Sequence, residues 1–309
     1  MTATTAPHSP AVGTAHRTSV AVIGTGAIGQ DLVSKVHRSP VLDCALVVGR
    51  NPDSAGLAHA ARLGYPTSAG GIEAVLAADR PFDVLLDATS AAAHVEHWRL
   101  LADTPTLLVD LTPSKIGQMV VPTVTGTHGP TGRDVSLISC GGQASIPIAH
   151  GLAERFAVDY IEVVSTVAST IAGRATRLNL DEYVATTQHA LTTFTDVPET
   201  KAILNISPAV PPATFRTAVH AVIPGADADA VRSVVDAVAA RVREFAPGYR
   251  VIACAVAGDR VVVSVEVIAD SDVLPHYAGN LDIINSAAIL VAEQHAARLG
   301  RAAGTGARS

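Results

Sequence analysis

Short apolar stretches alternate with amphipathic ones through the first half of the sequence. Each apolar stretch is followed by turn-forming residues, which is typical of strands that a parallel sheet buries on both faces. Helical stretches such as Gln30–Arg38 separate them. The pattern therefore predicts an α/β fold with a doubly wound parallel sheet. The predicted strands are Val20–Ile23, Leu42–Val48, Val84–Asp87, Leu107–Leu111 and Val135–Ser139.

The pattern changes after about Val158, where longer strands follow one another with fewer helices between them. Asp227–Phe245 places valines on one stripe and predicts an amphipathic helix. This order predicts a second α+β domain with a more antiparallel sheet. A final helix, Leu281–Leu299, is expected to pack back on the first domain, and Gly300–Ser309 to form a frayed tail. The strands predicted here are Tyr160–Ser169, Ala213–Ile223, Tyr249–Val256 and Val261–Ala269, the last two flanking a hairpin turn at Ala257–Arg260.

The composition argues against a nucleic-acid-binding, membrane-spanning or disulfide-bonded protein. The 309 residues carry a formal net charge of -6, which gives no basic surface for nucleic acid. Residues 1–19 are rich in Thr, Ala, Pro and His and lack the apolar run of a signal peptide, and no apolar run elsewhere is long enough for a membrane span. Cys44, Cys140 and Cys254 are odd in number and widely spaced, which argues against disulfides and against a metal site. We therefore expect a reduced, cytoplasmic protein.

A glycine-rich turn, Gly24-Thr-Gly-Ala-Ile-Gly29, directly follows the first predicted strand and opens a helix. In this context Gly24 permits a tight turn, Gly26 lets the backbone approach a pyrophosphate, and Gly29 permits close packing of helix on strand. The free N–H groups of the helix N-terminus then face the phosphates. The motif favours a Rossmann-type dinucleotide site, with a purely structural turn as the alternative.

The second predicted strand is followed by Arg50, near the place where the adenosine ribose of a dinucleotide is bound. An arginine at this position indicates that NADP is possible beside NAD. The alternative is that Arg50 is a solvated surface charge.

Cys140 stands at the end of a predicted strand, and Gly141-Gly142-Gln143 leads into a helix predicted from Ile146. A helix N-terminus favours a thiolate and lowers the pKa of a thiol. The amides of the two glycines would then stabilise an oxyanion formed from a bound carbonyl. The alternative is a buried core cysteine, which is also the interpretation of Cys44 and Cys254.

Five stretches in order resemble the acylating acetaldehyde dehydrogenases, of which the chain is identified as a divergent member. The resemblance implies a fold like that of the semialdehyde and glyceraldehyde-phosphate dehydrogenases, with Cys140 as the nucleophile that carries an acyl thioester. It also implies that the cofactor contacts are Thr25, Gly26, Ala27 and Ile28, then Ile171, Ala172, Gly173, Arg174, Ala175, Thr176, Arg177, Leu178 and Asn179, and Asn280. The stretches are Ala21–Gly29, Asp87–His94, Asp110–Pro113, Ser139–Pro147 and Tyr277–Ile283.

The chain departs from the family pattern at three places. Arg174-Ala175 replaces Pro-Gly in the cofactor loop, Thr217 stands where the family has Asp or Asn, and the stretch between Tyr249 and Tyr277 is shorter. The second change removes a candidate general base, so a base is sought at His220 or Asp181, with His276 a weaker candidate. The third leads us to expect weak binding, or none, of the 4-hydroxy-2-oxovalerate aldolase with which the family is paired.

The boundaries that follow are residues 1–19, a disordered tail; 20–145, a dinucleotide-binding domain; 146–279, a substrate and dimerisation domain; and 280–309, a C-terminal helix that returns to the dinucleotide-binding domain, with its tail. The predicted activity is oxidation of acetaldehyde or another short aldehyde by NAD(P) and coenzyme A, in a homo-oligomer that is most simply a dimer. Two alternatives stay open. One is a Cys-dependent oxidoreductase of this fold with a different aldehyde or acyl acceptor, and the other is a non-catalytic dinucleotide-binding subunit.

Overall fold

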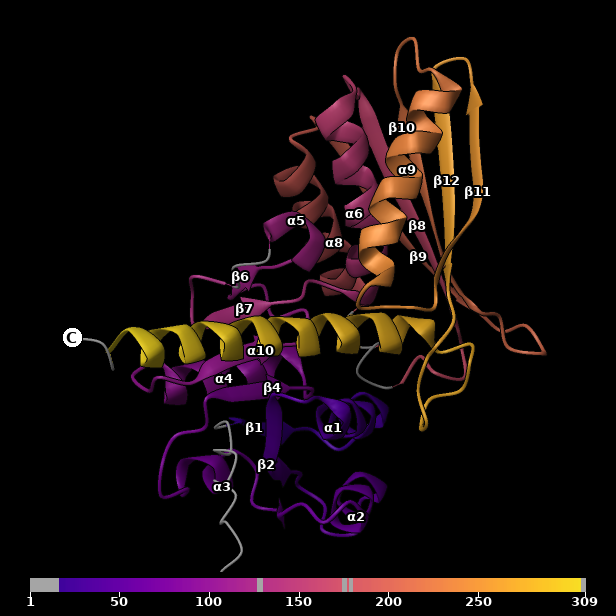
Figure 1. Cartoon of the computed structure of the whole chain (residues 1–309). Coiled ribbons are helices and arrows are strands. Elements are labelled where there is room, and N and C mark those ends of the chain that lie inside the picture. The colour runs from indigo at the N-terminus through magenta and orange to yellow at the C-terminus, as the bar shows by residue number, and fades with distance from the viewer. Residues whose placement is uncertain (1–16, 127–129, 174–176, 178–179, 307–309) are drawn as a thin grey trace, which may run out of the picture.

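Two sheets organise the chain (Figure 1). The computed structural model describes residues 17–126, 130–173, 177 and 180–306. In the first sheet the strand order is β3-β2-β1-β4-β5-β7-β6 and every neighbouring pair is parallel. The chain crosses from one half of this sheet to the other between β3 and β4, so a crevice forms beyond the carboxyl ends of β1 and β4. The strands are β1 Thr18–Ile23, β2 Leu42–Val48, β3 Thr67–Ser68, β4 Val84–Asp87, β5 Leu107–Asp110, β6 Gln118–Met119 and β7 Asp134–Ser136.

Helices cover both faces of the first sheet, which confirms the predicted doubly wound α/β fold. The central strands are apolar and buried because both of their faces meet helices. Helix α1 buries Leu32, Val33 and Val36 and carries basic residues in its last turn, where the helix dipole favours them. The helices in this part of the chain are α1 Ala27–Arg38, α2 Ala55–Arg62, α3 Ile72–Leu76, α4 Ala91–Leu101 and α5 Pro122–Thr125.

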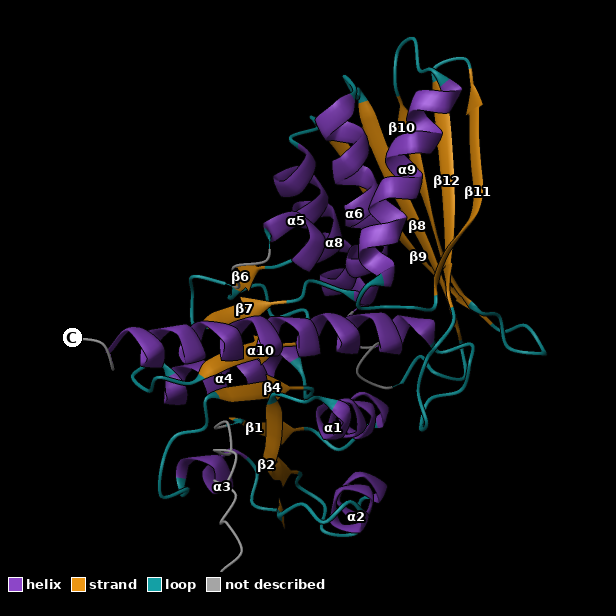
Figure 2. Cartoon of the chain, in the orientation of Figure 1, coloured by secondary structure: helices purple, strands orange, loops and turns teal. Residues whose placement is uncertain are grey.

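The second sheet has the order β11-β12-β10-β8-β9, with all neighbours antiparallel except the parallel pair β8 and β9. Helices pack on one face, and none of the described helices covers the other (Figure 2). Along β10, Phe215, Thr217 and Val219 are buried while the residues between them are not, as a one-sided sheet requires. The elements are β8 Tyr160–Ala168, β9 Glu199–Ser207, β10 Phe215–Val222, β11 Tyr249–Ala257 and β12 Arg260–Val267, with α6 Cys140–Arg155, α8 Leu180–Thr195 and α9 Ala228–Arg243.

The last helix, α10 (Gly279–Gly306), runs from the second sheet back across the first (Figure 1). Its apolar residues Ile284, Ala288 and Val291 belong to the core of the first sheet. Buried polar contacts hold it against α1, because Asn285 donates to Asp31 at 2.8 Å and Lys35 pairs with Asp282 at 2.7 Å. No helix of the described residues is long and apolar enough to cross a membrane.

Several boundaries differ from the sequence prediction. The last helix continues to Gly306, so the expected frayed tail from Gly300 is wrong as far as that residue. Strand β1 begins at Thr18, inside the expected tail, because Asp83 accepts from the amide and hydroxyl of Ser19. Helix α6 begins at Cys140 rather than Ile146. Helix α8 and strand β9 were not predicted, and residues 1–16 of the expected tail lie outside the description.

Candidate active site

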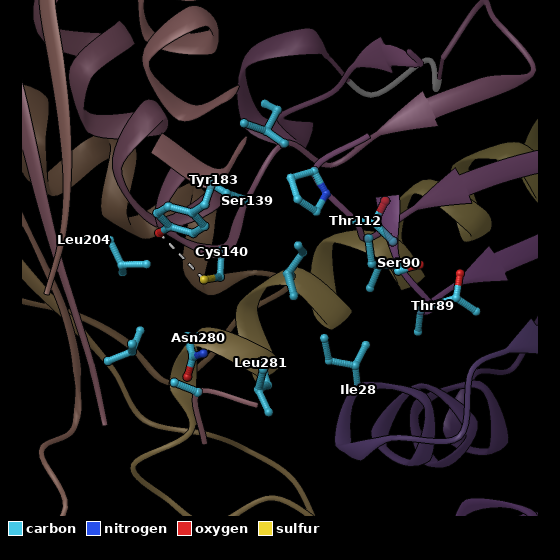
Figure 3. A pocket seen from close by; sticks show the side chains of 17 residues that line it. Ile28, Thr89, Ser90, Thr112, Ser139, Cys140, Tyr183, Leu204, Asn280 and Leu281 are labelled. Carbon is cyan, nitrogen blue, oxygen red and sulfur yellow. Dashed lines mark hydrogen bonds between the residues drawn. The ribbon is translucent and has the colours of Figure 1, made fainter. Parts of the chain in front are cut away.

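A cavity of about 130 Å³ lies where the carboxyl ends of β1, β4 and β5 meet the N-termini of α6 and α10 (Figure 3). Ile28 from the glycine-rich turn and Cys140 from α6 both line it. The fold therefore brings the predicted dinucleotide turn and the predicted nucleophile to one cavity. The lining residues are Ile28, Ala88, Thr89, Ser90, Leu111, Thr112, Pro113, Ile138, Ser139, Cys140, Val167, Ala172, Tyr183, Leu204, Asn280, Leu281 and Ile284.

The glycines of the turn have the geometry that a dinucleotide requires. Gly24 has φ 111°, and a Cβ there would lie 2.4 Å from the Ala88 carbonyl oxygen. A Cβ on Gly29 would lie 1.9 Å from the carbonyl oxygen of Gly24, so only glycine permits this packing of α1. A Cβ on Gly26 would meet no atom within 4 Å, and no side chain caps α1 at this residue. Open space in front of an uncapped helix N-terminus fits a pyrophosphate.

Cys140 is the first residue of α6, directly after a strained turn. Ile138 has φ 67°, an unusual conformation for a β-branched residue that only the surrounding structure can maintain. Ser139 then caps the helix, because its Oγ accepts from the amide of Gly142 at 2.9 Å and bonds to Oγ1 of Thr187 at 2.7 Å. These contacts fix the thiol at the cavity, half-buried between the cores of the two sheets.

The electrostatic setting of the thiol differs from the expectation. Burial raises the pKa of Cys140, although hydrogen bonds from Tyr183, Gly141 and Asn280 act in the opposite direction. The backbone amides at the helix terminus lower the pKa as expected, but desolvation of the thiolate is the larger effect, so the net direction is the opposite of the prediction. The expected oxyanion donors are also in use: the Gly141 amide donates to Tyr183 Oη at 3.0 Å, and that of Gly142 to Ser139.

Asn280 lies in the first turn of α10 and contributes its side-chain amide to the cavity. The residue is only 7% exposed, it hydrogen-bonds to Cys140, and its Oδ1 has no partner among the described residues. The hydroxyl of Thr112, across the cavity, also lacks one there. Two buried acceptors without partners in a cavity wall are suited to a ligand that carries N–H donors, such as a carboxamide.

The described residues of the loop 171–179 lie at different distances from the cavity. Ala172 lines the cavity, whereas Ile171 packs with Leu274 in a small apolar cluster. Gly173 is not among the lining residues, and the guanidinium of Arg177 donates to the carbonyls of Ala172 and Ser169. Arg174, Ala175, Thr176, Leu178 and Asn179 lie outside the described residues.

None of the proposed bases lies beside the thiol. His220 is three residues beyond the inward-facing Thr217, so it lies on the open face of the second sheet, and its candidacy is wrong. Asp181 and His276 are exposed and do not line the cavity. Thr217, in the position of the family's acid, is buried and bonds to Ser165 Oγ at 2.6 Å.

The residues beneath the other side of the cavity were not singled out as a group from the sequence. We name them the buried charge cluster. His94 is fully buried, with Nδ1 3.0 Å from Asp87 and Nε2 3.1 Å from Asp134. Because both ring nitrogens face carboxylates, the imidazole is doubly protonated. The members are Asp87, His94, His97, Asp110 and Asp134.

The cluster has strongly altered pKa values. Burial would lower the pKa of His94, but its bonds to Asp134 and Asp87 raise it to about 10. Burial would raise the pKa of Asp87, but His94 and His97 lower it to about 2. Burial raises that of Asp110 to about 6, against the effect of His94. Among the described residues, neither this cluster nor any other group of three His, Cys, Asp or Glu side chains is placed to hold a metal ion.

The same carboxylates hold two loops that line the cavity. Asp87 accepts from the amide and hydroxyl of Thr89, at 3.1 and 2.5 Å. Asp110 accepts from the Thr112 amide at 2.7 Å and from the Ser114 hydroxyl at 2.5 Å. We call the loops 88–90 and 111–113 the cofactor wall, and the opposite lining residues Ile138–Cys140 and Tyr183 the thiol wall.

The remaining candidates are distant from the cavity. Cys44 is buried, and burial raises its pKa to about 12, as a core cysteine requires. Cys254 is half-buried against the core of the second sheet. All three cysteines are free. Arg50 is exposed after β2, which is compatible with either interpretation of its role.

Comparison with known proteins gives two family profiles. The profile described as prokaryotic acetaldehyde dehydrogenase, dimerisation, matches residues 140–275. The profile described as dihydrodipicolinate reductase, N-terminus, matches residues 18–112. The first match covers the strands of the second sheet, and the second covers strands β1 to β5 of the first sheet.

Two relatives that align over nearly the whole chain are both named acetaldehyde dehydrogenase. An acetaldehyde dehydrogenase of Streptomyces griseus subsp. griseus is 66% identical, covering 96% of each chain. One of Burkholderia pseudomallei is 45% identical, covering 92% of this chain and 97% of that one. The fold matches aspartate semialdehyde dehydrogenase II of Vibrio cholerae with a TM-score of 0.61 at 13% identity, over 90% of this chain and 99% of that one. The predicted semialdehyde-dehydrogenase-like fold is confirmed, and at 66% identity the chain is not a divergent member.

Proposed function

The chain belongs to the acetaldehyde dehydrogenase family and is an aldehyde-oxidising enzyme, and from that premise we propose that it converts acetaldehyde or another short aldehyde to its acyl-coenzyme A thioester. NAD is the proposed oxidant, with NADP possible. The observation that carries the proposal is the single cavity lined by both Ile28 of the glycine-rich turn and the Cys140 thiol.

The residues around the cavity fit a nicotinamide dinucleotide. Gly24, Gly26 and Gly29 would hold its pyrophosphate against the N-terminus of α1, where the space over Gly26 is open. Asn280 Oδ1 and Thr112 Oγ1 would accept from its carboxamide. The dinucleotide, when bound, supplies the acceptor for a hydride.

Cys140 would carry the acyl group. Its thiolate attacks the aldehyde carbon, and a carbon–sulfur bond forms as the carbonyl oxygen becomes an oxyanion. Departure of the hydride leaves a thioester on Cys140. The thiolate of coenzyme A then attacks this thioester, so the acyl group leaves as acyl-coenzyme A and the Cys140 thiolate is regenerated. The side-chain amide of Asn280, which hydrogen-bonds to Cys140, would donate to the oxyanion.

The cavity also favours a short apolar acyl group. Val167 and Leu204 line it, and none of its described lining residues is a lysine, arginine, aspartate or glutamate. A charged aldehyde would therefore lose its hydration without a compensating partner.

The test is an assay of NADH formation from acetaldehyde and NAD with and without coenzyme A, combined with mass spectrometry of the protein. We expect turnover with coenzyme A and, without it, an acyl adduct on the peptide that contains Cys140. Turnover with another thiol or with water alone would favour a different acyl acceptor. Dinucleotide binding with neither adduct nor turnover would favour a non-catalytic subunit.

We further propose that the open face of the second sheet is the interface of a dimer. Val164 lies in register with Ala218 and Ile203, and these side chains are half-buried with no described helix over them. The dimerisation profile covers these residues, which supports homo-oligomerisation. A stable dimer buries about 1,200–2,000 Å². Ala218→Glu is expected to yield monomers in size-exclusion chromatography with light scattering, whereas Val95→Glu, on the exposed surface of α4, leaves the dimer intact.

The cellular setting and the aldolase remain proposals from the sequence. Three free cysteines suit a reducing cytoplasm. The β11–β12 hairpin turns over only Gly258-Asp259, and we propose that this short hairpin offers an aldolase too little surface for stable binding. A stoichiometric complex on co-expression with a 4-hydroxy-2-oxovalerate aldolase would contradict this.

A further inference from the structure

The hydroxyl of Tyr183 lies beside the reactive sulfur. Tyr183 belongs to α8, lines the cavity and is 9% exposed. Its Oη is 3.8 Å from Cys140 Sγ, the contact drawn as a dashed line in Figure 3. The amide of Gly141 donates to the same Oη at 3.0 Å. The hydroxyl is therefore held on one side by the backbone and faces the sulfur on another.

Gly141 is what lets this hydroxyl approach. A Cβ at position 141 would lie 2.1 Å from Tyr183 Oη and 2.5 Å from Ser165 Oγ. Either distance is far below contact, so any larger residue would push the hydroxyl away from the thiol. Glycine is therefore required after Cys140 so that the Tyr183 hydroxyl can come close to the thiol.

This phenol has two side-chain neighbours, Cys140 Sγ, whose neutral thiol donates to Tyr183 Oη at 3.8 Å, and Ser165 Oγ. Ser165 already bonds to Thr217 at 2.6 Å. When the sulfur is ionised, it is the only charged acceptor of the two, and bonds to charged acceptors are the stronger ones. A phenol whose lone pair is taken by the Gly141 amide therefore directs its proton to the thiolate.

We propose that Tyr183 is a further catalytic residue, whose hydroxyl is oriented by the Gly141 amide and donates a hydrogen bond to the Cys140 thiolate. The proposal rests on the proposed function, in which Cys140 is the nucleophile. It also explains how the site works with Thr217 in place of a carboxylate. Three uncharged hydroxyl groups form a hydrogen-bonded chain that begins at the sulfur, in the order Tyr183, Ser165 and Thr217. The thiolate is therefore stabilised by hydrogen bonds and not by a charged partner.

Few other groups near the cavity could change the pKa of the Cys140 thiol. Cys140 and Tyr183 are the two titratable residues among the described residues that line the cavity. Thr187 and Ser139, from α8 and the start of α6, are neutral. A change in the thiol pKa after removal of the Tyr183 hydroxyl therefore reports on this one contact.

The test is Tyr183→Phe, with the rate of iodoacetamide alkylation at Cys140 followed by peptide mass spectrometry from about pH 6 to about pH 10. Loss of a hydrogen bond to a charged group is expected to raise the thiol pKa by about one unit. The acid limb of the kcat/KM profile for the aldehyde should move by the same amount. An unchanged thiol pKa in the folded variant would overturn the proposal.

Tyr249→Phe is the matched control. Tyr249 is fully buried, and its hydroxyl donates to the carbonyl of Ala144 in α6 at 2.8 Å, so the substitution likewise removes a phenol oxygen that contacts α6. In the Tyr249→Phe variant, the pKa of the Cys140 thiol should equal that of the unaltered protein. A shift as large as that of Tyr183→Phe would mean that any loosening of α6 has this effect, and would overturn the proposal.

A second replacement covers the case in which Tyr183→Phe fails to fold. 3-Fluorotyrosine at position 183 keeps the shape and makes the phenol a stronger donor, so the thiol pKa should fall. An unchanged or higher value overturns the proposal. The alkylation profile does not depend on turnover, so it measures the contact between Tyr183 and Cys140 even if the enzyme mechanism is different. Activity of the Cys140→Ala variant, in contrast, would contradict the proposed function alone.

Discussion

The cofactor wall and the thiol wall line one cavity but rest on different kinds of polar group. Behind the cofactor wall, Asp87 and Asp110 hold the loops and are themselves held by a charged His94. Behind the thiol wall the contacts are between hydroxyls, with Ser139 bonded to Thr187 and Ser165 to Thr217. Each wall is fixed by buried hydrogen bonds, but only one of them contains buried charges.

The difference matters for the chemistry. A carboxylate close to Cys140 would oppose ionisation of a thiol whose pKa burial already raises. The loops of the cofactor wall need only rigidity, and their charges are paired and lie beneath the loops. The arrangement keeps the strong electrostatic contacts beneath the loops that we propose position the cofactor, and it leaves the proposed nucleophile among neutral hydroxyl groups.

The largest effect is expected from Cys140→Ala, which removes the chemistry of the thiol wall and leaves the cofactor wall intact. Turnover should fall by at least about a thousandfold, as when the nucleophile of a covalent mechanism is removed. The affinity for the dinucleotide, measured by fluorescence titration, should stay within about twofold, because the glycine-rich turn supplies the phosphate contacts. Activity above a tenth of the original would exclude a covalent route through this residue.

Cys44→Ala is the control for loss of a thiol. Cys44 is 3% exposed within β2 and remote from the cavity. We expect about 1 kcal/mol lower stability in urea denaturation and an unchanged rate per folded molecule.

His94→Gln should have the next largest effect, since it removes the positive charge from the buried charge cluster. Three carboxylates then face one another without it, and the free energy of unfolding at neutral pH should fall by about 3–5 kcal/mol. Urea denaturation measures this. A loss below about 1 kcal/mol would show that buried charges do not stabilise the cofactor wall, which would contradict the proposed difference between the two walls.

The pH dependence sharpens the same comparison. The pKa of His94 is about 10 in the folded chain against 6.5 as its ordinary value, so its stabilisation is complete below pH 6.5 and is lost as the pH rises toward 10. Between about pH 7 and 8.5 the free energy of unfolding should decrease by about 1.4 kcal/mol per pH unit. His94→Gln should abolish this slope. Cys44 and Cys140 add their own losses only where thiols of the unfolded chain ionise, near pH 9.

The fold could be predicted because its signals are local. Continuous apolar runs bounded by turns are sufficient to locate the central strands, and β2 and β4 begin and end where predicted. Strand β9 was missed because Glu199–Ser207 is mostly polar or half-exposed, and its parallel pairing with β8 provides what its own pattern lacks. The start of α6 was missed because Gly141 and Gly142 disfavour a helix on propensity alone, whereas Ser139 caps it.

The site was predictable only in part, for the same reason. Cys140 and the glycine-rich turn are marked by their immediate neighbours in sequence. Tyr183 is 43 residues from Cys140, and Asp134 is 40 from His94, so no periodicity connects either pair. His220 shows the converse, because a histidine on a strand is placed on one face or the other by a register that the sequence alone did not give.

Arg50→Ala tests whether the residue after β2 contacts the adenosine end of the dinucleotide. If Arg50 binds a 2′-phosphate, the affinity for NADP should fall about tenfold while that for NAD stays constant, since the lost bond is to a charged group. Titration with both dinucleotides measures this. Equal effects would mean that Arg50 is a surface charge only.

Ser139→Ala should have the smallest effect, and it tests the neutral side of the comparison. The change removes the helix cap and the bond to Thr187, and no charge is left without a partner. The expected loss is about 1 kcal/mol in urea denaturation, the typical value for an N-cap. Ser54→Ala is the matched control, because Ser54 caps α2 through the Leu57 amide outside the cavity. Both variants should lose similar stability, but only Ser139→Ala should lower kcat, since it loosens the turn that presents Cys140. A loss as large as that of His94→Gln would show that hydroxyl contacts hold the thiol wall as strongly as charges hold the cofactor wall.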